Sequence, residues 1–357
     1  MRVNQLEKLS KIRPAPIITK EVLDKFSCYT PLKAPLDMSI DKQLKMYYQI
    51  NLIREFDTKV RDLWMKDRIY GLAHSYVGAE AIAVGACMAL RPDDCITSTH
   101  RGHGHTIAKG GDIKKMMAEL FGKYEGYNHG KGGSMHIADV ENGMLGATGI
   151  VGSGMPLAVG SAMAADLLDN GKVTICFHGD GGTNQGVWHE SINMAAAWNL
   201  PVVFLTENNQ MAISTELSSV TRETNIFLRA QGYGILGVQV DGFNPFAVYV
   251  AVKEAVDFAR SGKGPTLIEA RFVRLVGHFV ADNEWYRDLE AVKPFWSLDP
   301  IVRMRAYFLD HKIVGEGKLN ALEDSVKKEI KEAIHYALVE CTEPPLDRLF
   351  DNLYANE

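Results

Sequence analysis

The chain of 357 residues has a hydrophobic content of 46% and a formal net charge of −5, with a pI of about 6.1. This composition is sufficient for a large buried core, and its mild acidity gives no electrostatic reason to expect nucleic acid or an anionic membrane as a partner. The five cysteines are widely spaced and form no CxxC pair, which indicates free thiols in a reducing compartment and excludes a disulfide framework or a zinc ribbon.

The first part of the chain is predicted to be an arm followed by helices. No apolar run of about 18 residues and no signal or transit segment is recognisable, so we expect a cytoplasmic protein without a membrane span. Residues 1–38 are rich in proline and lack hydrophobic periodicity, which predicts an extended N-terminal arm. Residues 39–357 predict a single α/β domain. Within it, apolar residues three and four apart predict a core-facing helix over 41–69, and small residues predict a closely packed helix over 78–90.

The next feature is the polar segment His100-Arg101-Gly102-His103-Gly104-His105. Three histidines so close together could ligate zinc, but no helix or strand period brings all three to one point, and the neighbouring Arg101 disfavours a cation. Arginine and histidine beside glycines suit an anionic oxygen better, because a guanidinium forms bidentate charged hydrogen bonds with phosphate. A phosphate site is the preferred interpretation, and a structural loop and a zinc site are the alternatives.

Three glycine-rich segments follow different patterns. Residues 130–136 lack the G-x-x-x-x-G-K-[ST] spacing of a P-loop, so we reject that interpretation. Residues 149–152 lead into a helix of small residues predicted over 157–165. Residues 232–237 match G-x-G-x-x-G, but a helical stretch precedes them and the strand predicted at 237–240 follows. This is the wrong order for a dinucleotide site, so the sequence predicts a helix-to-strand turn.

The strongest signal comes from two predicted buried strands. Apolar runs at 172–177 and 201–206 predict neighbouring parallel strands, joined by a helix over 187–199. Asp180 follows the first strand and Asn209 follows the second, at the edge where open α/β sheets bind ligands.

The residue types at this edge suit a metal and a phosphate. Mg²⁺ prefers oxygen ligands and is usually held by one or two protein groups together with phosphates. The helix that begins near Asn184 adds main-chain amides and a positive dipole. We therefore predict a magnesium–diphosphate cradle around Asp180 and Asn209. The alternative is an ordinary sheet-edge turn in which these two side chains are caps.

Downstream, the sequence predicts an amphipathic helix over 245–260, a strand over 265–273 and a charged, solvated helix over 320–339. Glu269 and Arg271 in that strand suggest an interface or a salt bridge.

A lone histidine, His278, follows the strand just before residues 279–288, which we expect to form a mobile loop. Such a histidine is more often structural than catalytic. Its position just beyond a strand end raises the odds of a functional role, because functional residues concentrate on such loops.

Taken together, these motifs resemble a known family. The stretch Gly179-Asp180-Gly181-Gly182-Thr183-Asn184-Gln185-Gly186, followed by Asn193-Met194-Ala195-Ala196 and Glu207-Asn208-Asn209, closely resembles the alpha subunits of the first component of 2-oxo-acid dehydrogenase complexes. The resemblance covers residues 40–354. It implies a thiamine diphosphate-binding fold, with a doubly wound, mostly parallel α/β sheet flanked by helices. The segment 100–105 is most similar to acetoin dehydrogenase alpha subunits.

The resemblance implies a metal site with three oxygen ligands. Asp180, Asn209 and the main-chain carbonyl of Met211 match the positions that hold Mg²⁺ in the family. The family usually has tyrosine where this chain has Met211, but a carbonyl ligand does not depend on the side chain, so we expect the site to be kept. Gly181 and Gly182 of the motif belong to the cofactor-binding set.

Other positions match the family's contacts to the organic part of the cofactor. His100 and Arg101 match an aromatic residue or histidine followed by the arginine that binds the diphosphate. Gly149 and Val151 match the turn that contacts the aminopyrimidine ring and supports the bent cofactor. The segment 130–136 resembles the family's glycine-rich segment, which implies a shaped loop near the cofactor.

The resemblance assigns the candidate catalytic residue to the loop after the last predicted strand. Arg274 and His278 match a basic residue and a histidine that order around the cofactor, and the histidine helps the acyl group to reach the lipoyl arm. Many relatives have a serine after this histidine, which is phosphorylated in mitochondrial members. This chain has Phe279 there, so we expect no control by phosphate. Val276 and Phe279 also make the loop less polar than usual.

The implied function is that of an alpha subunit dependent on thiamine diphosphate and Mg²⁺. It cleaves acetoin, or decarboxylates a pyruvate-type 2-oxo acid, and passes the acyl unit to lipoamide. In relatives the beta chain supplies a catalytic glutamate, which implies two alpha and two beta chains with the cofactor between them. A lipoyl acyltransferase and a dihydrolipoyl dehydrogenase act downstream. The alternatives are a non-catalytic scaffolding or regulatory paralogue, and a magnesium- or zinc-dependent hydrolase that uses Asp180 and the histidines.

Overall fold

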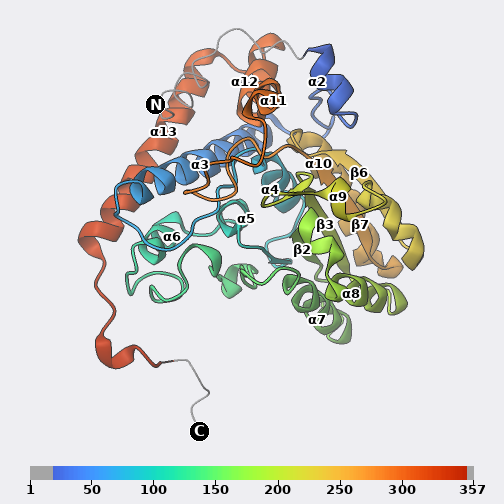
Figure 1. The fold of residues 1–357 in the computed structure, drawn as a ribbon, viewed down its shortest axis with the longest axis horizontal. Helices are drawn as coiled ribbons and strands as arrows, with labels where there is room; N and C mark the ends of the chain where they lie inside the picture. Colours follow the sequence, from blue (N-terminus) through green and yellow to red (C-terminus); the bar gives the residue numbers. More distant parts are fainter. Residues whose placement is uncertain (1–18, 352–357) are drawn as a thin grey trace.

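The centre of the molecule is a five-stranded sheet in the order β1-β2-β3-β7-β6. The computed structural model describes residues 19–351. Every pairing in this sheet is parallel, and helices lie on both of its faces (Figure 1). The strands are β1 Cys95–Thr97, β2 Thr174–Gly179, β3 Val202–Asn208, β6 Leu236–Asp241 and β7 Thr266–Arg271. The predicted doubly wound parallel sheet is confirmed.

The helices that cover the sheet agree with the predicted series, with different ends. The predicted helix over 41–69 ends early, and the chain reverses at Asp67, which has a φ of 52°. None of the helices between residues 19 and 351 combines the length and apolarity that a membrane span requires. Their bounds are α2 Lys20–Lys25, α3 Ile40–Trp64, α4 Glu80–Cys87, α5 Gly102–Lys109, α6 Ile113–Leu120, α7 Gly154–Leu167, α8 Gly186–Ala197, α9 Leu217–Val220, α10 Pro245–Phe258, α11 Leu289–Val292, α12 Pro300–Asp310 and α13 Glu316–His335.

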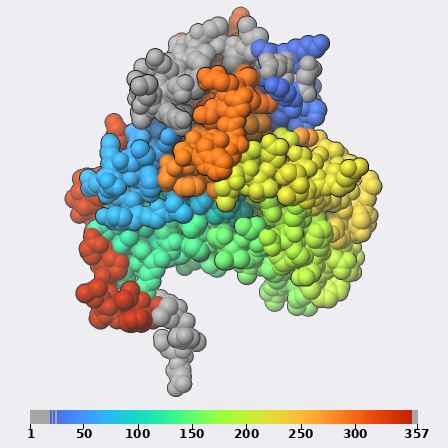
Figure 2. Space-filling view, viewed as in Figure 1, coloured from blue at the N-terminus to red at the C-terminus, as the bar shows by residue number. Residues whose placement is uncertain are grey.

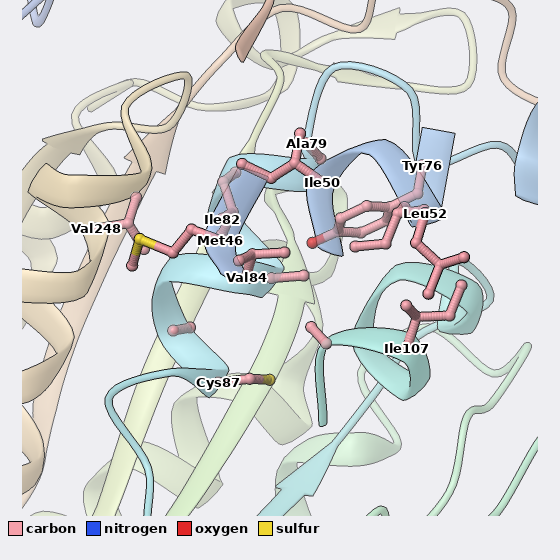
Figure 3. Packing of buried hydrophobic residues seen from close by; sticks show 14 of the residues in the cluster. Met46, Ile50, Leu52, Tyr76, Ala79, Ile82, Val84, Cys87, Ile107 and Val248 are labelled. Carbon is pink, nitrogen blue, oxygen red and sulfur yellow. The ribbon is translucent and has the colours of Figure 1, made fainter. Parts of the chain in front are cut away.

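Strand residues alternate between two apolar cores, as expected for a parallel sheet that is covered on both faces. Ile175 and Phe177 of β2 belong to the core with α3, α4 and α10. Cys176, between them, packs with α7 and α8 on the opposite face. Figure 3 shows part of the first core, where Met46 of α3 and Val248 of α10 lie near the residues of α4.

The N-terminal arm differs from the extended segment that we expected. Residues 1–18 lie outside the described residues. Beyond them Thr19 caps the short helix α2, and Phe26 is buried against Phe243, with ring centroids 5.5 Å apart. Arg303 then donates a hydrogen bond of 2.6 Å to the carbonyl of Thr30. Residues 19–38 therefore pack on the body, and the domain boundary after residue 38 stays a prediction.

Two smaller predictions concern the far edge of the sheet. Residues Ile226–Tyr233 form a 3₁₀ helix directly before β6, so the predicted helix-to-strand turn at 232–237 is confirmed. The expected salt bridge in β7 is not formed. Within residues 19–351, neither Glu269 nor Arg271 takes part in an ion pair. Glu269 instead accepts a hydrogen bond of 2.6 Å from the Asn208 amide, and Arg271 donates to Gln210 over 2.8 Å.

Candidate cofactor site

Asp180 lies where β2 ends, and the structure leaves one of its carboxylate oxygens without a partner. The side chain is 2% exposed, and Oδ2 has no hydrogen bond. Burial raises the carboxyl pKa to about 6, although the main-chain amide of Asn209 and the charges of Arg274 and Arg101 oppose this shift. A buried carboxylate oxygen without a partner is rare in proteins, and a bound ion is one way to satisfy it. The residues at this edge therefore fit a cation.

The loop after β3 brings further oxygens to Asp180. Gly179 pairs with Glu207 in the sheet, so β2 and β3 end side by side. Met211 donates its main-chain N–H to Asn209 Oδ1 over 3.1 Å, and Gln210 between them adopts a φ of 67°. This tight turn brings the amide oxygen of Asn209 and the main chain of Met211 to the same edge. The set of one carboxylate, one amide and one carbonyl suits Mg²⁺.

The glycines of the motif permit a close approach of the chain segments. A Cβ on Gly181 would lie 2.7 Å from the Cβ of Ala212, in the strand that follows Met211. A Cβ on Gly182 would lie 3.8 Å from Val151 Cγ1. Gly181 is therefore required for packing against the metal-site loop, while Gly182 connects the motif to the turn before α7.

The raised pKa of Asp180 predicts that Mg²⁺ binding depends on pH. Below about pH 6 the metal-free carboxyl holds a proton that the metal must displace. The apparent affinity should therefore be constant above pH 7 and fall by about tenfold per pH unit below pH 6. Titration calorimetry with Mg²⁺ and inorganic pyrophosphate in the assembled enzyme measures this dependence. A flat profile between pH 5 and pH 7 would contradict it.

Two buried guanidinium groups meet at His278. Arg101 Nη2 lies 2.8 Å and Arg274 Nη1 lies 3.1 Å from His278 Nδ1. Both arginines are donors only, so Nδ1 accepts and the imidazole carries its proton on Nε2. Burial and the positive charges of Arg101 and Arg274 lower the His278 pKa to about 2, so the ring is neutral.

These arginines form a ready anion site. Arg101 and Arg274 are 8% and 3% exposed, and within residues 19–351 neither forms an ion pair with a carboxylate. Burial and the charge of Arg274 lower the Arg101 pKa to about 10. An anion placed here would gain charge-assisted hydrogen bonds and relieve the repulsion between the two cations. The donor set fits a diphosphate.

The structure adds His74, which sequence reasoning missed. Its ring centroid lies 4.6 Å from that of His100 and 4.9 Å from that of His278. His74 Nδ1 and His100 Nε2 are buried without partners, and burial and the charge of Arg101 lower their pKa values to about 3 and about 2. His74 lies in the linker between α3 and α4. This position after a core helix is the only sequence signal that could have indicated a role at the site.

The zinc alternative for residues 100–105 is wrong because the three histidines point to different partners. His103 Nδ1 lies 2.8 Å from Asp57 Oδ1. His105 Nδ1 lies 2.7 Å from Ser98 Oγ, and its Nε2 lies 3.2 Å from Glu207 Oε1. Only His100 joins the site, where the three imidazoles that meet are those of residues 74, 100 and 278. The two arginines beside this group disfavour a cation there.

The glycine-rich loop at 130–136 binds a carboxylate of the chain itself. Glu119 of α6, 1% exposed, accepts main-chain N–H bonds of 2.8–2.9 Å from residues 128, 130, 132 and 133. The amides that a P-loop would turn toward a phosphate are therefore occupied, which confirms that the loop is no P-loop. Ser134 at its end lies 2.9 Å from His103 Nε2 and so links the loop to α5.

The remaining predicted residues lie at the rim of the site. A Cβ on Gly149 would lie 3.8 Å from His136 Nε2, and Val151 at the start of the turn before α7 is 51% exposed. The structure thus places Val151 beside Gly182, with about half of the residue exposed.

The segment predicted as a mobile loop forms several turns in the structure. Asp282 accepts the main-chain N–H of His278 over 2.6 Å. Arg287 donates to the carbonyls of Arg274 and Val276 over 2.6 Å and 2.7 Å. Asp282 and Arg287 therefore hold the backbone around His278, a role that sequence reasoning missed. The mobility of residues 279–288 stays a prediction.

The fold and this site together define a class of protein. It is a doubly wound α/β protein with a metal-type oxygen set and an anion site at the carboxyl edge of its parallel sheet, the arrangement of a diphosphate-cofactor enzyme.

Comparison with known proteins identifies the family. Residues 48–345 match the family described as Dehydrogenase E1 component, and the chain belongs to it. It is 46% identical to the acetoin:2,6-dichlorophenolindophenol oxidoreductase alpha subunit of Bacillus subtilis, over 85% of this chain and 90% of the relative. It is 41% identical to the alpha subunit of the same name from Cupriavidus necator, over 89% and 96%. The pyruvate dehydrogenase E1 alpha subunit of Porphyra purpurea is 35% identical, over 90% and 95%.

The chain is therefore an E1 alpha subunit of the acetoin or pyruvate dehydrogenase type, an oxidoreductase subunit of a thiamine diphosphate-dependent enzyme. The resemblance inferred from the sequence motifs is confirmed.

Proposed function

We propose that this chain binds thiamine diphosphate and Mg²⁺ and, together with a beta subunit, cleaves acetoin and passes the two-carbon acyl unit to lipoamide. Two features of the same site carry the proposal. Asp180 is buried and one of its carboxylate oxygens has no partner, and the buried guanidiniums of Arg101 and Arg274 form no ion pair within residues 19–351. Acetoin is preferred to pyruvate because two relatives with 46% and 41% identity carry acetoin in their names.

The proposed roles follow from the geometry. Asp180, Asn209 and the Met211 carbonyl would hold Mg²⁺, and His100, Arg101 and Arg274 would bind the diphosphate. When bound, thiamine diphosphate supplies a nucleophilic carbon and an electron sink for carbon–carbon cleavage.

The other site residues would act around the organic part of the cofactor. Gly181 and Gly182 keep the motif open, and Gly149 and Val151 would support the aminopyrimidine ring. His278, the proposed catalytic residue, accepts from two arginines at Nδ1. It therefore holds its proton at Nε2, from which it can donate a hydrogen bond to an oxygen of the acyl unit.

The proposal includes partners and a compartment. The name alpha subunit in the relatives implies a beta chain. We propose two alpha and two beta chains, with a lipoyl acyltransferase and a dihydrolipoyl dehydrogenase downstream. The described cysteines are free thiols, which supports a reducing compartment such as the cytoplasm.

Reduction of dichlorophenolindophenol by the chain purified with its native partners tests this function. We expect acetoin-dependent turnover that requires both thiamine diphosphate and Mg²⁺, and little turnover with pyruvate or a branched 2-oxo acid. The alpha chain alone should bind cofactor weakly and catalyse little, because the beta chain would supply the catalytic glutamate. Preference for pyruvate would reassign the substrate. An assembled complex that binds no cofactor would favour the scaffolding alternative.

A further inference from the structure

A partly enclosed cavity of about 150 Å³ lies behind the loop that carries His278. Its walls come from α3, from the α3–α4 linker and from the segment 275–296. In the space-filling view the orange surface of that segment borders the blue surface of α3 (Figure 2). None of the residues proposed to bind the cofactor lines the cavity, which adjoins the site described above through Gly277 and Phe279 on either side of His278.

The walls of this cavity are largely apolar. Leu275, Val280, Leu289, Val292 and Trp296 contribute aliphatic and aromatic groups. A cavity of this volume accommodates a molecule of about the size of benzene. The apolar part of these walls favours a ligand that has a small hydrocarbon body.

The acidic residues of the lining already have partners within the chain. Asp57 lies 2.8 Å from His103 Nδ1. Asp282 accepts the His278 N–H over 2.6 Å, and Glu284 accepts from Arg287 Nε over 3.0 Å. These carboxylates are thus engaged, and none is left to receive a ligand cation.

The basic residues of the lining differ from the acidic ones. Lys293 pairs with Glu290 over 2.5 Å, on the exposed surface. Arg61 at the end of α3 is half-buried, and its guanidinium takes part in no hydrogen bond or ion pair with any residue from 19 to 351. Such a guanidinium, without a partner among these residues, is suited to a carboxylate, which it can bind in a bidentate manner.

We propose that this cavity is a binding site for a short-chain aliphatic carboxylate, with Arg61 receiving the carboxylate and the wall around Trp296 enclosing the alkyl group. The carbonyl of Ser75, which lines the cavity, accepts from Arg101 over 2.5 Å. Asp282, on another wall, holds the N–H of His278. Occupancy of the cavity therefore acts on residues that position two members of the cofactor site.

Tryptophan fluorescence of the full-length purified chain tests binding without any cofactor. We expect saturable titration with butanoate, and affinities about tenfold weaker for butanamide and butylamine, which match it in size but lack the negative charge. The signal should vanish in Trp296→Phe. Arg61→Met, which keeps the apolar stem, should bind all three probes alike. Equal affinity for the three probes in the wild type, or an unchanged preference in Arg61→Met, would overturn the proposal.

A second measurement tests the link to the cofactor site and rests on the proposed function. Butanoate at a concentration that fills the wild-type cavity but lies well below the Kd of the Arg61→Met variant should shift the apparent Kd for thiamine diphosphate in the wild-type assembly by about threefold or more. The same concentration should leave that of the Arg61→Met assembly unchanged. If the fluorescence titration succeeds and this shift is absent, the cavity binds carboxylates without acting on the site. Absence of cofactor binding in both assemblies would refute the proposed function and not the carboxylate site.

Discussion

Asp180→Asn is expected to abolish the response of the enzyme to Mg²⁺. The change removes a charged oxygen ligand and keeps the shape of the side chain. The apparent Mg²⁺ affinity, measured by cofactor-dependent dye reduction in the assembled enzyme, should fall by about 100-fold or more, since loss of groups that only support metal ligands already costs 10–100-fold.

The same substitution should stabilise the metal-free chain. Burial raises the Asp180 pKa from 3.8 to about 6. The folded state therefore binds the proton more tightly than the unfolded state, and stability is lost as the pH rises from about 4 to about 6. At pH 7 the cost of the buried charge is about 3 kcal/mol at about 1.4 kcal/mol per pKa unit.

Chemical unfolding of the metal-free alpha chain at pH 7 measures this effect. Asp180→Asn should unfold at higher denaturant concentration than the wild type, and the exposed Asp310→Asn should match the wild type in both assays. A variant that binds Mg²⁺ normally would show that Asp180 is an ordinary cap of the turn.

Glu119→Ala should destabilise the alpha chain by roughly 1–3 kcal/mol, the usual cost of leaving buried donors unsatisfied. Its carboxylate accepts four main-chain amides of the glycine-rich loop. Without it these partly buried donors lose their common acceptor. Glu119→Gln should lie between the variant and the wild type, because it keeps one acceptor oxygen but turns an NH₂ group toward two of the donors.

Urea unfolding followed by circular dichroism measures the loss. Glu141→Ala, which removes an exposed carboxylate from a nearby loop, is the matched control and should change stability by less than about 0.5 kcal/mol. If Glu119→Ala unfolds at the same urea concentration as this control, water satisfies the amides and the loop does not depend on the Glu119 carboxylate.

Local patterns were sufficient to predict the sheet and the edge at which Asp180 and Asn209 meet. Two apolar strands joined by a helix are compatible with few topologies, of which a parallel pair is the usual one. Residues that directly follow two such strands lie at the same carboxyl edge of the sheet. Asp180 and Asn209 were therefore predictable from their positions, as was the rejection of the P-loop at 130–136 from its spacing. These inferences needed only chain order and periodicity.

The missed residues depend on contacts between distant parts of the chain. His74 reaches the site because the α3–α4 linker packs against the loop after β7, a contact that no local pattern encodes. Asp282 and Arg287 were missed because they lie in the segment 279–288, which we expected to form a mobile loop. Glu119 could not be recognised from the sequence, because a carboxylate that binds main-chain amides has no distinctive neighbours in sequence.

The alternation of β2 between two cores also limits how this protein can change in length. Ile175 and Phe177 face one core and Cys176 faces the other. A single residue inserted into β2 would turn every later side chain of the strand to the opposite face. The insertion would turn side chains of each core toward the other core and shift Asp180 relative to the end of β3. The alternation of side chains along β2 therefore links the position of the Asp180 carboxylate to the packing on both faces of the sheet. Insertions are tolerable only in the connections outside the strand.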